Sequence, residues 1–327
     1  MLLAQVLGMA FDGEGGLVVA DRQTARIHFV TPEGIPVRMV GGTGSGPGEL
    51  RNLHAFGLLE DGRPWGYDAS NRRMVVLSTH DTLHVTHTMP RLGPHAWPSI
   101  AGGIAGPSLI VIERNFPLSA VLKPGAMVRD STRLLRLSLT TVGIAPLATV
   151  PRADILRLDG NGGPRTHGVP FGPYLSVAVD PKRQTVFWGF SELFLIARWH
   201  PANGIDTFVN MVADRQPIES QDIKTWFGKD AAMAAISAGN EPTHVPAFRR
   251  LLVATNGWLW VKEYLPEQGG PTRWAVFDSV GVLRRIVDLP AHFNLRAVNG
   301  DSAAGMVEED DGEQFVRLLR LVEVPKE

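Results

Sequence analysis

The chain has 327 residues, of which 44% are hydrophobic and 20% charged, and its formal net charge at pH 7 is -1. A charge this close to zero argues against an electrostatic grip on nucleic acid or on an anionic membrane. The chain has no cysteine, which excludes disulfides, a thiolate nucleophile and cysteine-bound zinc. No apolar run reaches the length of a membrane-spanning helix, and the start MLLAQVLGMAFD has no basic segment, so we expect no signal peptide.

The first forty residues contain a repeating unit. Residues 6–40 divide into four short apolar segments separated by turn-forming residues, a pattern that predicts a four-stranded meander. A second copy begins at Leu53, and Asp21 and Asp68 close the second segment of the two copies. The intervening GGTGSGPGEL, residues 41–50, lacks the Gly-Lys-Ser/Thr ending of a phosphate-binding loop. We therefore interpret it as a connector between repeats.

The same unit returns, more loosely, through the rest of the chain. Four-stranded meanders repeated six times predict an all-β fold, a single six-bladed β-propeller over residues 1–327. The expected blades are approximately 6–42, 53–90, 99–150, 171–212, 244–290 and 292–324. Only three clear strands occur in the last unit, so we expect Leu2–Gln5 or Val322–Val324 to supply its outer strand and close the ring.

One stretch resembles a known family. GMAFDGEGGLVVADRQTARIHFVTPEGIPVRMVGGTGSGPGEL, residues 8–50, resembles an NHL-type repeat, G-x-A-x-D-x-x-G-x-x-x-V-A-D, then N-x-R-I-x-x-F, then F-G-x-x-G-x-G-P-G-E-F. The match is partial over residues 53–89 and only architectural elsewhere, and Ala25 stands where the family often has Asn before the arginine. The resemblance implies a six-bladed propeller in which residues 41–50 cross from one blade's outer strand to the next blade's inner strand.

Three segments interrupt the repeat. Asn115–Asp130 lengthens a loop in the third unit, and Pro151–Pro170 reads as a proline- and glycine-rich bridge. Asp214–Pro242, between blades four and five, has a proline near its start and an alanine-rich body, which predicts a helical insertion. Insertions in repeat proteins often lie on the binding face, and an insertion that only plugs or flanks the barrel is an equal alternative.

Histidines recur between blades, near the expected mouth of the central channel. They are His54, His95, His167, His244 and His292. Neutral imidazoles that converge there would bind zinc, as in the amidating lyase among NHL-like propellers. Their distances from the first turn of each blade are uneven and no carboxylate partners are in view. We therefore expect no metal or other cofactor, with zinc as the alternative.

A second alternative is a calcium site of the kind that paraoxonase-like lactonase and esterase propellers use. Such a site needs converging oxygen ligands, and Asp180, Asn256 and Asn299 occur at first turns, where turn-forming residues are common in any β-protein. No G-x-S-x-G nucleophile motif occurs, so we assign no catalytic residue. The basic pairs Arg72-Arg73, Arg249-Arg250 and Arg284-Arg285 are interpreted as solvated faces.

Aromatic residues in the irregular segments suggest a contact surface. Trp97 lies in a loop, and Ile223, Trp226 and Phe227 form one stripe of the expected helix. We therefore predict a non-catalytic protein–protein interaction module, a soluble accessory or scaffold subunit whose partner is another protein or multi-subunit complex, a membrane complex included. Similar bacterial propellers are often exported, which favours the periplasm. The alternative is a zinc- or calcium-dependent lyase, or a lactonase/esterase-type hydrolase, with its site in the channel.

Overall fold

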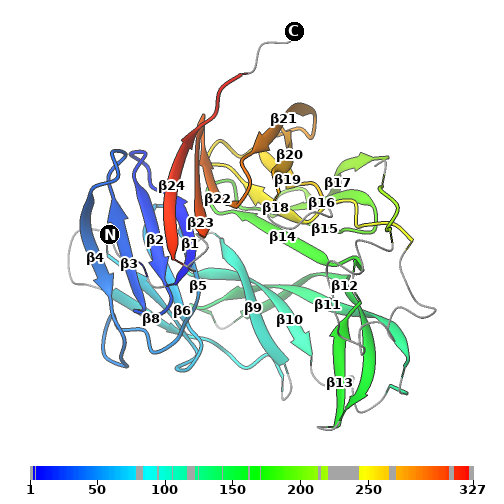
Figure 1. The fold of residues 1–327 in the computed structure, drawn as a ribbon. Coiled ribbons are helices and arrows are strands. Elements are labelled where there is room, and N and C mark those ends of the chain that lie inside the picture. Colours follow the sequence, from blue (N-terminus) through cyan, green and yellow to red (C-terminus); the bar gives the residue numbers. More distant parts are fainter. Residues whose placement is uncertain are drawn as a thin grey trace.

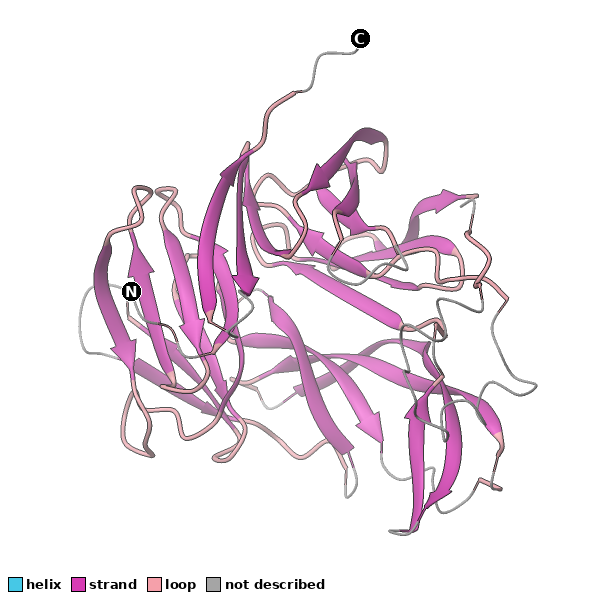
Figure 2. Cartoon of the chain, in the orientation of Figure 1, coloured by secondary structure: helices cyan, strands magenta, loops and turns pink. Residues whose placement is uncertain are grey.

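The computed structural model contains strands β1 to β24 in six antiparallel sheets, arranged around a central axis as the blades of a propeller (Figures 1 and 2). It describes residues 3, 5–78, 84–93, 96–104, 106–115, 122–123, 125–141, 143–160, 163–169, 171–212, 215–219, 243–264, 270–308 and 313–323. No helix occurs among these residues, and none of their segments is a helix that could span a membrane.

The helical insertion expected at 214–242 is therefore not supported. Residues 220–242 lie outside the described part of the chain. The described start of the segment is extended, because Pro217 forms an antiparallel bridge with His244. The expected helix start at this proline is thus a short β-bridge that leads back to blade five.

Blades one and two are regular four-stranded meanders. Each sheet follows the chain order from the inner strand to the outer one. Their strands are β1 (Val6–Phe11), β2 (Leu17–Asp21), β3 (Arg26–Val30), β4 (Pro36–Gly41), β5 (Leu53–Leu58), β6 (Pro64–Asp68), β7 (Arg73–Leu77) and β8 (His84–Thr88).

Blade three has five strands, and its outer part is much longer than that of its neighbours. The strands are β9 (Ala96–Ile104), β10 (Ser108–Asn115), β11 (Met127–Ser138), β12 (Gly143–Gly160) and β13 (Gly163–Gly168). Residues 151–168, expected as a bridge, are largely strand, because β12 pairs with β11 on one side and with β13 on the other. Pairing satisfies the backbone of this extension, which projects from the blade in Figure 1.

Blades four and five return to four strands in chain order. Their strands are β14 (Leu175–Asp180), β15 (Thr185–Phe190), β16 (Phe194–His200), β17 (Gly204–Met211), β18 (Arg250–Val253), β19 (Leu259–Lys262), β20 (Thr272–Phe277) and β21 (Leu283–Leu289).

Blade six closes the ring with three strands, β22 (Phe293–Asn299), β23 (Ser302–Glu308) and β24 (Gln314–Arg320). The outer strand expected from a chain end is not formed by the described residues. Gln5 belongs to blade one, where its carbonyl accepts a hydrogen bond from the N–H of Arg22 at 2.8 Å. Closure instead comes from packing of β22 and β23 against β1.

Most of the core lies in six layers, one between each pair of adjacent blades, and a smaller cluster is formed by Phe171, Val245 and Tyr264. The layer between blades five and six contains Trp260 and Trp274, whose rings meet edge-on with centroids 6.4 Å apart. The layer that closes the ring joins Val6 and Met9 of blade one to Ala304 and Met306 of blade six. Each blade is thus apolar on both faces, and burial against two neighbours stabilises it.

Residues 41–50 connect β4 to β5, as expected. Gly41, Gly42 and Gly48 have positive φ values of 85°, 148° and 74°, which glycine adopts without strain. The Gly46 N–H donates to the Glu49 carboxylate at 2.7 Å. A Cβ added to Gly44 would lie only 2.0 Å from that carboxylate. The glycines therefore let the chain turn tightly between blades.

Candidate functional site: the propeller channel

The inner strands of all six blades enclose one cavity. Strands β1, β5, β9, β14, β18 and β22 contact one another in ring order, and residues from each of them line a cavity of about 650 Å³. This volume lies within the range of small-molecule sites, roughly 300–1,000 Å³. The channel is therefore the candidate functional site.

Irregularities in the inner strands turn extra side chains toward this cavity. Four of these strands carry a one-residue register shift, and in each the skipped residue lines the cavity. These residues are Leu7, His54, Ala101 and Arg296. Bulges of this kind re-aim a side chain and are common beside active sites.

Two arginines from neighbouring blades line the same part of the channel. Arg250 begins β18 and donates a hydrogen bond to the Leu295 carbonyl at 3.1 Å, next to Arg296 on β22. Burial lowers the pKa of Arg250 to about 10, and the charge of Arg296 adds to this effect. Burial also lowers the pKa of Arg296. Among the described residues neither guanidinium has a carboxylate partner.

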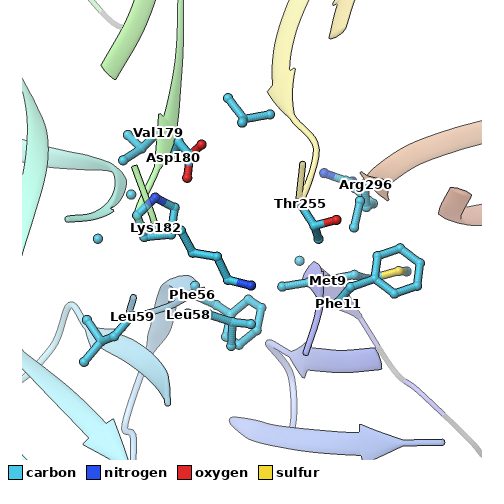
Figure 3. Close-up of a pocket in the computed structure, with 18 of the residues that line it drawn as sticks. Met9, Phe11, Phe56, Leu58, Leu59, Val179, Asp180, Lys182, Thr255 and Arg296 are labelled. Carbon is cyan, nitrogen blue, oxygen red and sulfur yellow. The ribbon is translucent and has the colours of Figure 1, made fainter. Parts of the chain in front are cut away.

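Polar groups at the ends of the inner strands form the rim of the cavity. Figure 3 shows Lys182 reaching into the cavity from the end of β14, next to Asp180 and opposite Thr255 and Arg296. Asp180 pairs with Arg183 at 3.0 Å. The Thr255 hydroxyl lies 2.6 Å from the Asn299 side-chain oxygen. Lys182 therefore brings a positive charge to the rim without an ion pair among the described residues.

Much of the remaining lining is apolar. Met9, Phe11, Phe56, Leu58 and Leu59 line the cavity, and Figure 3 shows them on the side below Lys182. A site that combines such a wall with a few fixed charges is typical of pockets for organic molecules. The channel can therefore hold an apolar body and a negatively charged group together.

The described histidines do not converge. Of the candidates, His54 alone lines the cavity, and its Nδ1 lies 2.8 Å from an Arg22 guanidinium nitrogen. His167 lies on the added strand β13, His244 beside the bridge to Pro217, and His292 in the turn before β22. The linkers between blades take different paths, so equal positions in the sequence do not place these rings at one depth.

His95 lies outside the described residues. Burial, together with the charges of Arg22 and Arg114, lowers the pKa of His54. Because Nδ1 faces an arginine donor, the neutral ring carries its proton on Nε2. His54 thus offers a hydrogen-bond donor at the channel.

The described channel residues do not fit a zinc or calcium site. No group of three or more histidine or carboxylate side chains lies together in the described part of the chain. The oxygen ligands considered above have other roles: Asp180 pairs with Arg183, and the Asn256 side chain accepts the Trp258 N–H at 3.0 Å. Arginine and lysine charges in the same cavity would also repel a cation.

The candidate partner residues are only partly described. Trp97 lies near the start of β9 and is 64% exposed, which is compatible with a contact surface. Ile223, Trp226 and Phe227 lie outside the described residues. A partner that docks there stays a prediction.

Sequence reasoning missed the channel cations. Arg250 was interpreted as half of a solvated pair, yet it starts an inner strand and faces the channel. Its position at the first residue of an apolar strand is the sequence feature that could have indicated a channel-facing side chain. Arg296 carried no such signal, because the bulge that turns it into the channel depends on how β22 pairs with β23.

Known proteins resemble the chain in structure alone. No family model matches it, and no curated protein sequence does. A member of the DUF4221 family from Bacteroides vulgatus is 10% identical, with a TM-score of 0.57 over 98% of this chain and 93% of that one. A candidate exported protein from Bacteroides fragilis is 12% identical, with a TM-score of 0.52 over 94% and 80%.

A gluconolactonase from Xanthomonas campestris is 13% identical, with a TM-score of 0.49 over 97% of this chain and 86% of that one. At these identities the likeness supports the six-bladed propeller fold and nothing finer. It does not establish an NHL family.

The expectation of a non-catalytic interaction module is corrected by the geometry of the channel, which residues of all six blades line. In this chain the charged and polar side chains gather in a channel cavity of ligand size. The alternative, an enzyme with its site in the channel, is therefore better supported.

Proposed function

We propose that the protein is an enzyme that binds a small organic molecule in its propeller channel and acts on it as a hydrolase or lyase. The observation that carries this proposal is the single cavity formed by the inner strands of all six blades, with charged side chains along an apolar wall. Enzyme sites of this size are concave and mostly apolar, with a few placed polar groups.

Lys182 is the side chain best placed to assist the reaction. It reaches into the cavity beside Asp180 and opposite Thr255 (Figure 3). An ammonium at this point would stabilise negative charge that develops on a substrate oxygen, the largest single contribution in many enzymes. We assign no step to zinc or calcium, because the described side chains do not fit either ion.

A substrate screen tests the proposal. The purified protein is assayed against aryl esters, lactones and their ring-opened acids, with and without a chelator, alongside Lys182→Met. The matched control is Lys123→Met, an exposed lysine away from the cavity. We expect turnover that survives chelation, falls about a hundredfold in Lys182→Met and is unchanged in the control. Absence of turnover and of thermal stabilisation by every compound would contradict the proposal.

Two finer assignments accompany this proposal. We infer that residues 8–50 are an NHL-type repeat, supported by the buried Asp21 at the end of β2 and by the glycine connector after β4. We also infer an extracytoplasmic location, in line with the candidate exported protein among the structural relatives. Cell fractionation of the source organism tests the location, and recovery only in the cytoplasm would contradict it.

A further inference from the structure

Two enclosed arginines in the channel lack the partner that their charge requires. Arg250 is partly buried among the inner strands, and its one side-chain hydrogen bond among the described residues goes to the Leu295 carbonyl. The Nε of Arg296 is buried and has no hydrogen-bond partner. Neither has a carboxylate partner among the described residues. A charge that is removed from water is unfavourable unless it is paired and hydrogen-bonded. This part of the channel therefore lacks a negatively charged partner for the two guanidinium groups.

The two arginines also lie close to each other, so repulsion between their charges further lowers the stability of the unliganded protein. They come from adjacent blades, and the charge of Arg296 helps to lower the pKa of Arg250. Arg296 reaches the cavity through the bulge in β22, where it has no partner residue on β23. Two like charges placed side by side on neighbouring strands are destabilising unless an anion lies between them.

The carboxylates that line the cavity do not supply that anion. Asp12 accepts the N–H groups of its own turn, from Glu14 at 2.9 Å and Gly16 at 2.7 Å. Asp180 is paired with Arg183, and Asp61 with Arg63. The remaining carboxylate, Glu60, is exposed in the turn after β5. Asp180 is the last residue of its inner strand and the other three follow the ends of theirs, whereas Arg250 begins its strand.

We propose that the channel recognises an organic carboxylate, whose anionic group binds between Arg250 and Arg296 while its apolar body packs on Met9, Phe11 and Phe56. The guanidinium fork matches a carboxylate in two parallel hydrogen bonds. The described part of the lining has no helix N-terminus, the usual backbone support for a phosphate. This inference rests on the proposed function, since it names the substrate class of the same cavity.

Calorimetric titration tests the inference. The probes are phenylpropionate, its neutral analogue phenylpropanol, and phenyl phosphate. We expect phenylpropionate to bind most tightly. Its affinity should fall about ten- to hundredfold in Arg250→Met and in Arg296→Met, because each variant loses charge-assisted hydrogen bonds. Arg296→Lys keeps the charge but loses the fork, so its loss should be smaller.

The matched control is Arg273→Met, on the third strand of the same blade as Arg250. It removes one positive charge from an exposed ion pair with Asp288. It should bind phenylpropionate as the wild type does. Far-UV circular dichroism confirms that each variant is folded.

The outcomes separate the two proposals. Equal affinity for phenylpropionate and phenylpropanol, or unchanged affinity in both arginine variants, would overturn the carboxylate assignment and leave a channel enzyme intact. Tighter binding of phenyl phosphate would overturn it in favour of a phosphate. If esters and lactones are not turned over while the arginine variants still lose carboxylate binding, the catalytic proposal fails and the anion site stands.

Discussion

Two regions of this propeller bury charge, and they treat it in opposite ways. At the end of β6, Asp68 is fully buried and its carboxylate accepts the N–H groups of Arg51, Asn52 and Asn71 at 3.1–3.2 Å. In the channel, the Arg250 side chain is partly buried and has one carbonyl as its only described hydrogen-bond partner. The first charge is completely satisfied and the second is not.

The difference indicates that the first kind of charge stabilises the fold and the second kind binds a ligand. Asp68 joins the turn after β6 to the segment that enters β5, and Asp21 does the same in blade one, where it accepts the N–H groups of Gln5 and Gln23. A buried charge with all its partners fixes the backbone. A buried charge without partners lowers stability, and proteins keep such groups mainly at functional sites. The channel cations therefore mark where a ligand completes the structure.

The largest effect is expected from removing the satisfied charge. Asp68→Ala leaves three backbone N–H groups and Arg73 without their acceptor. We expect a loss of about 3 kcal/mol in the free energy of unfolding, the usual consequence of breaking a buried charged network. Urea denaturation measures it. Asp61→Ala, which removes an exposed partner of Arg63, should change stability by less than about 1 kcal/mol.

The loss of stability at low pH provides a second test of the role of Asp68. Burial acts to raise the pKa of Asp68, but the hydrogen bonds from Arg51, Asn71 and Asn52 outweigh it and hold the pKa below its ordinary value. The folded chain therefore releases this proton more readily than the unfolded one. The stabilisation is present above the ordinary carboxyl pKa and is lost as the pH falls through the folded pKa. In Asp68→Asn this loss should be absent.

Removal of the unsatisfied charge should have the opposite sign. Arg250→Met replaces a partly buried guanidinium that has no described carboxylate partner by an apolar side chain about as long as the aliphatic part of arginine. We expect the free energy of unfolding to rise by about 1–3 kcal/mol, while carboxylate binding is lost. Arg273→Met, from an exposed ion pair, should not stabilise the protein. A destabilised Arg250→Met would mean that the arginine is structural and would contradict the comparison.

The fold was predictable because short stretches of sequence indicate the strands and turns of each repeat. Turn residues after Phe11 and the aspartates that end β2 and β6 show blade boundaries in a single sequence. Trp260 and Trp274, which lie in apolar segments of the sequence, are buried between blades five and six. The extension of blade three was missed, because proline and glycine in residues 151–170 mask a strand that is stabilised by its pairing with β11.

The site was not predictable in the same way. The histidines share a position between blades in the sequence, but the inner strands, not the linkers, line the cavity. His54 reaches it because it lies on a bulge of β5. Which residue bulges depends on pairing between strands, which no composition or spacing rule gives. The closing blade, with three strands and no described terminal strand, follows from the same kind of long-range packing.

A smaller effect is expected beside the arginines. Lys262 pairs across the sheet with Arg250. Burial and the charges of Arg249 and Arg250 lower the pKa of Lys262 to about 8. Between that pH and the ordinary lysine pKa, roughly 10, the unfolded chain binds more protons than the folded one. The free energy of unfolding therefore rises with pH across this window.

Lys262→Met should remove that rise. We expect the variant to be more stable than the wild type near neutral pH, with a difference that shrinks as the pH approaches about 10. Urea denaturation at several pH values measures it, and the exposed Lys123→Met is the control. A wild type and variant with parallel pH profiles would show that the lysine is not perturbed by the channel cations.

The smallest effect is expected at the rim of the channel. Arg183 neutralises Asp180 at 3.0 Å and also donates to the Thr255 carbonyl at 3.3 Å. Arg183→Met leaves the Asp180 charge facing the cavity, where it opposes an incoming carboxylate. Because the Arg183 side chain is 45% exposed, stability should fall by only about 0.5 kcal/mol. Phenylpropionate affinity should fall about two- to fivefold, since solvent at the rim screens the uncovered charge.

The control is Arg198→Met, whose partner Asp206 lies on the outer strand of the same blade. Added salt should restore much of the lost affinity in Arg183→Met, because screening weakens repulsion between charges near solvent. An affinity that is unchanged at low salt would mean that the anion binds too deep in the channel to sense the rim.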